Sequence, residues 1–134
     1  MPSIDAIQGL SRTQARNLRR NRVRTTEALL KRSATRADRK ALAGITGLDE
    51  KEILSWANRA DLMRVKGVGE EYADLLEAAG IDTVKELRRR NPNSLLRQLV
   101  ELNDKKNLVR RLPTEDMVEG WVSGAKKLEP VISY

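Results

Sequence analysis

The sequence contains an internal repeat: shifted by 58 residues, its two halves align without a gap for more than twenty positions. Five aligned pairs are identical: Gly9/Gly67, Ala15/Ala73, Leu18/Leu76, Thr25/Thr83 and Leu29/Leu87. Further on, the register changes by seven residues, and Trp56 aligns with Trp121. A duplication with one longer loop, around residues 103–113, accounts for this pattern; the alternative is a chance similarity between amphipathic helices. We therefore expect two repeats, residues 1–60 and residues 61–134.

Apolar spacing within the repeats predicts helices. Residues 70–79, for example, carry apolar side chains at the intervals of one helical face. Only 3% of residues are aromatic and none is Phe, which suits packed helices better than a sheet. We expect helices over residues 11–20, 25–31, 34–43, 49–60, 70–79, 84–89, 94–101 and 114–128, with residues 56–68 joining the repeats as a helix. The predicted fold is all-α: two tandem helical units packed as one compact structure around Leu18, Leu29, Trp56, Leu76, Leu87 and Trp121.

Missing residue types exclude several chemistries. The chain has no Cys and no His, so it has no thiolate nucleophile, no Ser-His-Asp triad, no usual zinc site and no disulfide. No apolar run approaches the roughly 20 residues of a membrane span. The first residues lack the basic and apolar regions of a secretory signal. We expect a cytoplasmic protein that is not an enzyme, uses no cofactor or metal and binds no membrane.

Two residue groups have an alternative interpretation. The acids at 70, 71, 74 and 77 would suit magnesium only if acids converged on them from other elements, so a solvated helix surface is preferred. Trp56 and Trp121 occupy equivalent repeat positions on amphipathic helices, which favours core anchors over platforms for base stacking.

The positive charge is concentrated in the first third of the chain. The sequence has 26 Lys and Arg against 19 Asp and Glu, a net charge of +7. Residues 1–43 hold eleven of the bases and three of the acids, a net charge of +8, whereas residues 44–134 have a net charge of −1. A surface of one sign attracts polyanions. The alternative is a solvated helix face that keeps the protein soluble, but the shortage of acids favours a polyanion partner.

One segment of the second repeat resembles the helix-hairpin-helix family. It runs Val65-Lys66-Gly67-Val68-Gly69, continues through Leu75-Leu76 and Gly80-Ile81, and ends in Thr83-Val84-Lys85-Glu86-Leu87. The first repeat matches less closely, with Gly9-Leu10-Ser11 in place of Gly-apolar-Gly. Over its whole length the chain resembles a family of duplicated helix-hairpin-helix proteins without an established function.

The resemblance implies a phosphate contact. In DNA-binding members of that family, backbone amides of the hairpin and of the following helix hold a phosphate, because a helix N-terminus favours an anion. The corresponding residues here are Gly67, Val68 and Gly69 with Lys66, but Glu70 and Glu71 open the next helix and would repel a phosphate. In the first repeat the corresponding residues are Gly9, Leu10 and Ser11, followed by a stripe of four arginines: Arg12, Arg16, Arg19 and Arg20.

Two functions follow from these patterns. The first is a nonenzymatic nucleic-acid-binding protein that contacts the backbone, most simply of DNA, without sequence preference. The alternative is a protein-interaction adaptor, whose basic first repeat meets an acidic protein surface or another copy of the chain. We expect a monomer or a weak homodimer.

Overall fold

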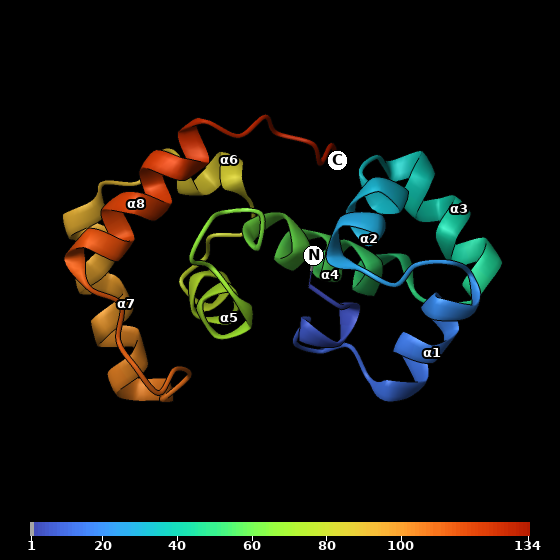
Figure 1. The fold of residues 1–134 in the computed structure, drawn as a ribbon, viewed down its shortest axis with the longest axis horizontal. Helices are drawn as coiled ribbons and strands as arrows, with labels where there is room; N and C mark the ends of the chain where they lie inside the picture. The colour runs from blue at the N-terminus through green and yellow to red at the C-terminus, as the bar shows by residue number, and fades with distance from the viewer. Residues whose placement is uncertain (1) are drawn as a thin grey trace. The chain divides into compact units, whose positions relative to one another are not determined.

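A computed structural model describes residues 2–134 (Figure 1). The described chain is all-helical, and it contains no strand beyond one isolated bridge between Ser3 and Thr25. Its elements are the 3-10 helix η1 (Ile4–Ala6) and the α-helices α1 (Arg12–Arg20), α2 (Thr26–Ser33), α3 (Arg36–Thr46), α4 (Glu50–Leu62), α5 (Glu70–Ala78), α6 (Val84–Leu87), α7 (Pro92–Lys106) and α8 (Glu115–Lys126). The prediction of an all-α fold is confirmed.

The chain divides into two compact units. The first unit runs from the N-terminus to Asp61 and also includes Val131–Tyr134, and the second unit is Leu62–Pro130. The boundary between them falls at the last residues of α4, whose range is Glu50–Leu62. The last four residues were predicted to belong to the second repeat, whereas in the structure they group with the first unit.

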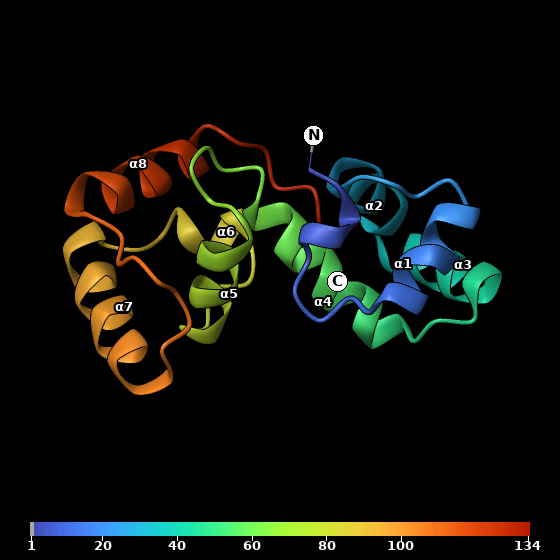
Figure 2. The same cartoon turned by 60° about the horizontal axis from the view of Figure 1, so that its bottom comes forward.

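The first unit has its own apolar core. Its buried side chains come from η1, α1, α2, α3 and α4 and from the turns between them. Figure 2 shows the course of these elements in the backbone. Leu18, Leu29 and Trp56 are all buried in this cluster, and Ile132 from the C-terminal segment packs against it. The first unit is therefore held together partly by a residue from the far end of the sequence.

The second unit has a separate cluster of buried residues. Leu76, Leu87 and Trp121 lie within it, together with apolar residues of α5 to α8 and of the turn before α5. The rings of Trp121 and Tyr72 lie 5.0 Å apart between centroids at an interplanar angle of 50°, a favourable tilted arrangement. The prediction that both tryptophans are core anchors is confirmed, since each is only 2% exposed.

Polar side chains fix where most helices begin. Thr35, Asn91 and Thr114 accept hydrogen bonds from backbone amides in the first turns of α3, α7 and α8. Asn91 caps α7 and Pro92 is its first residue, so α7 begins two residues before the predicted start at residue 94. The helix then continues to Lys106, five residues past the predicted end at residue 101.

The predicted helix over residues 56–68 is wrong at its C-terminal end. α4 stops at Leu62, and the chain turns over residues 63–69 before α5. The amides of Val65 and Val68 donate to the carbonyls three residues earlier, of Leu62 and Val65. These tight turns bury both valines and replace the helical pattern.

No helix in the described part of the chain is long and apolar enough to cross a membrane.

Candidate nucleic-acid interface

The first hairpin connects η1 to α1. The amide of Ile7 donates to the Ile4 carbonyl at 3.1 Å, and the amide of Leu10 donates to the Ile7 carbonyl at 3.3 Å. Gly9 lies between them with φ +86°, in the left-handed region that glycine occupies without strain. Ser11 then caps α1, and the amide of Ala15 donates to its carbonyl at 2.9 Å.

The second hairpin shows the same hydrogen bonds 58 residues later. Val65 donates to Leu62 at 3.1 Å, Val68 to Val65 at 3.0 Å, and Ala73 to Gly69 at 2.9 Å. Gly67 has φ +89°, close to the +86° of Gly9. Val68 at the tip of the turn is buried, whereas Lys66, Gly67 and Gly69 are exposed. The structure therefore brings Lys66, Gly67, Val68 and Gly69 together in one turn.

The end of the following helix repeats as well. The amide of Val23 donates to the Leu18 carbonyl at 2.9 Å, and the amide of Ile81 donates to the Leu76 carbonyl at 3.0 Å. In both units the residue that precedes the donor in sequence has a positive φ: 66° at Arg22 and 87° at Gly80. The two α1–α2 and α5–α6 connections thus have matching backbone geometry.

The two hairpins differ at the N-terminus of the helix that follows. At α1, the Ser11 hydroxyl accepts from the Gln14 amide at 3.1 Å, and the Gln14 side-chain oxygen accepts from the Ser11 amide at 2.9 Å. This capping box occupies two of the amides that would meet a phosphate. Gln14 was not among the predicted site residues, although the Ser-x-x-Gln spacing of residues 11–14 signals such a box.

The start of α5 has no side-chain cap. Gly69 stands at the N-cap position in an extended conformation and offers no side chain to the first amides. Glu70 and Glu71 occupy the first turn, where their charge suits the helix dipole. Glu71 also accepts a hydrogen bond from Arg110 at 3.2 Å, so one of the two acids is partly neutralised by a base from another element.

Three of the four predicted arginines of α1 are exposed. Arg12, Arg16 and Arg20 project into solvent. Arg19 is half-buried and forms an ion pair with Asp5 of η1. The candidate surface is therefore Arg12, Arg16 and Arg20, beside Gly9, Leu10 and Ser11 of the first hairpin. The pairing could not be predicted from the sequence, because Asp5 is 14 residues from Arg19 and its proximity depends on the fold.

Other bases of the chain have structural partners. Arg39 is 4% exposed and donates to backbone carbonyls, so it adds little to the surface charge of the first unit. Arg88 donates to the Lys126 carbonyl at 3.1 Å, and Arg90 donates to the Gln98 side chain at 3.2 Å. Among the described residues, no three His, Cys, Asp or Glu side chains are grouped so that they could hold a metal ion, and this includes the acids of α5.

A family model matches the part of the chain that contains both hairpins. The model of a family described as a domain of unknown function (DUF4332) matches residues 8–128. The chain belongs to the DUF4332 family. The DUF4332 match begins one residue before Gly9 and ends just after α8, so it takes in all eight α-helices of the described chain. No solved structure matches the chain significantly.

Proposed function

We propose that this DUF4332 protein is a nonenzymatic nucleic-acid-binding protein built from two tandem helix-hairpin-helix units. It binds the phosphate backbone without sequence preference, most simply on DNA, and its first unit contributes most of the binding. The second hairpin provides a weaker contact because acids occupy the start of α5.

The tandem arrangement is supported by the backbone. The hydrogen bonds of the two hairpins, the positive φ of Gly9 and Gly67, and the threonines at the N-caps of α2 and α6 all recur at a spacing of 58 residues. Two unrelated pairs of helices would not be expected to repeat the same backbone hydrogen bonds at one constant spacing, so the recurrence supports a duplication. The C-caps of α3 and α7 are also alike, since Gly47 and Asn107 are both left-handed.

The observation that carries the binding proposal is the exposed basic face of α1. Arg12, Arg16 and Arg20 are spaced four residues apart, so they share one side of a helix that begins at the first hairpin. Guanidinium groups bind phosphate oxygens through paired N–H donors. Three of them on one helix face neutralise several phosphates without reading the bases.

An adaptor function is the second candidate, and one observation favours it. Both helices that follow the hairpins have their first turns occupied by the protein's own groups: a capping box at Ser11 and Gln14, and acids at Glu70 and Glu71. Amides that already bind the protein's own side chains, or that lie beside its own acids, are less able to bind a phosphate. The basic face of α1 would then bind an acidic protein surface.

Binding to labelled random-sequence duplex DNA over a salt series tests the proposal. We expect measurable affinity that falls linearly with log salt. Replacing Arg12, Arg16 and Arg20 together by Gln lowers the salt slope by up to about 2.7, because each lost phosphate contact on duplex DNA removes about 0.9. The loss is the same for unrelated sequences, since backbone contacts carry no base information.

A matched control removes the same charge from the second unit. Arg97, Lys105 and Lys106 are exposed on α7, and their replacement by Gln has a smaller effect on the slope. If both triple variants lower the salt slope equally, binding depends only on net charge. That result would contradict a specific binding surface on α1. If the wild-type chain does not bind duplex or single strands below about 100 µM at 50 mM salt, where nonspecific binding is expected, the adaptor function replaces this proposal.

A further inference from the structure

The last four residues form no helix or strand and lie against the first unit. The Ser133 amide donates to the Ala34 carbonyl at 2.8 Å, and the Ser133 carbonyl accepts from Arg39 at 2.8 Å. Both polar backbone groups of this residue are therefore bound by the first unit. Such pairing depends on the backbone of the bound segment and not on its side chain, as in the recognition of extended peptides.

Arg39 is built into this surface. Its side chain is 4% exposed, and its Nη1 donates to the carbonyls of Ser33 and Ala34 at 2.9 and 3.2 Å. These bonds hold the guanidinium at the end of α2, so that Nη2 is directed to Ser133. Without the C-terminal segment, Nη2 would lose this acceptor.

Side chains on both sides of Ser133 add to the contact. Ile132 is half-buried against the core of the first unit. The Tyr134 hydroxyl lies 3.2 Å from the side-chain oxygen of Asn58, and its ring centre is 6.0 Å from the Arg39 guanidinium carbon. The bound pattern is an apolar residue followed, two positions later, by an aromatic residue that stacks near a cation.

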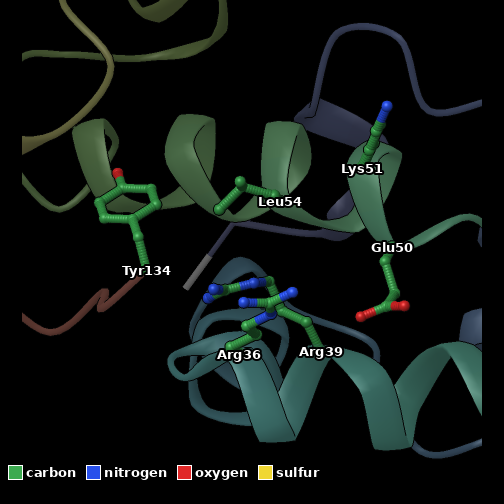
Figure 3. Close-up of a pocket in the computed structure, with 6 residues that line it drawn as sticks. All are labelled: Arg36, Arg39, Glu50, Lys51, Leu54 and Tyr134. Carbon is green, nitrogen blue, oxygen red and sulfur yellow. The ribbon is translucent and has the colours of Figure 1, made fainter.

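The surface has more room than the segment fills. At Tyr134, a pocket of about 310 Å³ is lined by Arg36, Arg39, Glu50, Lys51, Leu54 and Tyr134 (Figure 3). In this view Arg36 and Arg39 extend from α3, and Leu54 and Tyr134 lie on the side of α4. At Val131, a hollow of about 370 Å³ is bounded by Leu30, Ala34 and the stems of Glu27 and Lys31. Val131 and Tyr134 are 38% and 66% exposed, so a larger side chain at either position could bury more surface against the first unit.

We propose that the first unit carries a binding groove for an extended peptide, and that residues 131–134 are its displaceable occupant. The partner is an extended segment with an apolar residue and, two positions on, an aromatic residue. It pairs its backbone with the Ala34 carbonyl and Arg39 after the protein's own segment has left. Release is local, because it breaks a few contacts at the surface and leaves the helices in place.

The test uses the full chain with its own segment disabled. Ile132→Asp removes the apolar contact, and Ser133→Pro removes the amide that donates to Ala34. A fluorescent peptide with the sequence of residues 129–134 is titrated into this double variant, into the wild type and into Ser133→Ala. We expect the double variant to bind the peptide at least tenfold more tightly than the other two, because their tethered segment competes at high effective concentration.

Peptide variants check the recognition without disturbing the protein. A peptide with proline at the position of Ser133 loses binding at least tenfold, whereas one with alanine there binds as before. A peptide with phenylalanine at the position of Val131 binds several-fold more tightly, because the hollow beside Leu30 and Ala34 takes the larger side chain. A dimer of the wild type that Ser133→Pro abolishes would support the groove and identify a second copy as the source of the peptide.

Three results would overturn the proposal. The first is no binding of the peptide to the folded double variant below about 1 mM, the range of the weakest complexes. The second is equal binding by the wild type and the double variant, which would show that the segment does not occupy the groove. The third is loss of helical circular dichroism in the double variant, which would make residues 131–134 part of the fold and not a displaceable occupant.

Discussion

A Cβ atom on Gly67 would lie 3.2 Å from Nε1 of Trp121. The second hairpin is thus packed against the central tryptophan of its unit, and the contact leaves no room for a side chain to enter without a shift. Gly67 also has φ +89°, which an L-residue rarely adopts. Its role in the structure is independent of any ligand, because both constraints are present in the protein alone.

We expect Gly67→Ala to destabilise the second unit by about 1–3 kcal/mol, from the cost of a positive φ and from the displacement of Trp121. Thermal unfolding followed by circular dichroism and by tryptophan fluorescence measures this loss. A melting temperature equal to that of the wild type would contradict it.

Gly69→Ser is the matched control. Gly69 has φ −98°, and nothing lies within 4 Å of a Cβ placed there. Serine would also supply the missing cap of α5, as Ser11 does for α1, so we expect stability to rise by about 0.3 kcal/mol, the small difference between serine and glycine at an N-cap. A loss comparable to that of Gly67→Ala would mean that the hairpin resists any side chain and that the contact with Trp121 is not the cause.

The sequence predicted the local features of this fold well because they depend on neighbours in the chain. Helices were predicted to begin at residues 11, 25 and 114, and Ser11, Thr25 and Thr114 are the N-caps of α1, α2 and α8, each accepting a hydrogen bond from a backbone amide. One of Gly67 and Gly69 was expected at a positive φ or in close backbone contact, and Gly67 has φ +89°. The interactions of these residues are with neighbours a few positions away in the chain, so a single sequence is enough to predict them.

The features that depend on distant parts of the chain could not be predicted in this way. Asp5 reaches Arg19 only when η1 packs beside α1, and Arg39 can donate to Ser133 only because residues 131–134 return to the first unit. Charge counting treats both arginines as surface bases. The predicted stripe therefore loses Arg19, and the total of eleven bases in residues 1–43 overstates the exposed charge.

Arg22 provides a test of the repeat by stability. It has φ 66° at the position where the second unit has Gly80 with φ 87°. A left-handed residue other than glycine costs about 1–2 kcal/mol, part of which Arg22→Gly recovers despite the greater freedom of the unfolded chain. We expect a gain of about 0.5–1 kcal/mol in urea unfolding. Gly80→Arg should lose a similar amount. A loss of stability in Arg22→Gly, or a gain in Gly80→Arg, would show that the two turns are not equivalent.

The ion pair of Asp5 limits the basic surface of α1. Asp5→Asn releases Arg19, and we expect tighter binding of duplex DNA together with a salt slope larger by up to about 0.9, one further phosphate contact. The pair is largely exposed, so its removal costs at most about 1 kcal/mol of stability.

Glu27→Gln is the control for this change. Glu27 is an exposed acid of the same unit on α2, and its replacement alters the net charge by the same amount. If both variants increase the salt slope equally, the release of Arg19 is not the cause, and the effect is one of net charge alone.

The acids at the start of α5 provide the last test, because they separate the second hairpin from the first. Glu70 is exposed in a first turn without a side-chain cap, so Glu70→Lys exchanges a repulsive charge for an attractive one beside open amides. We expect DNA binding to strengthen severalfold, at a cost of about 0.3–1 kcal/mol in helix stability from the dipole. Glu101→Lys makes the same charge change at an exposed position of α7 and should strengthen binding less. Anisotropy titrations of both variants at one salt concentration decide between the outcomes: a larger effect at Glu70 supports a phosphate site at the second hairpin, and an equal effect removes that hairpin from the proposed interface.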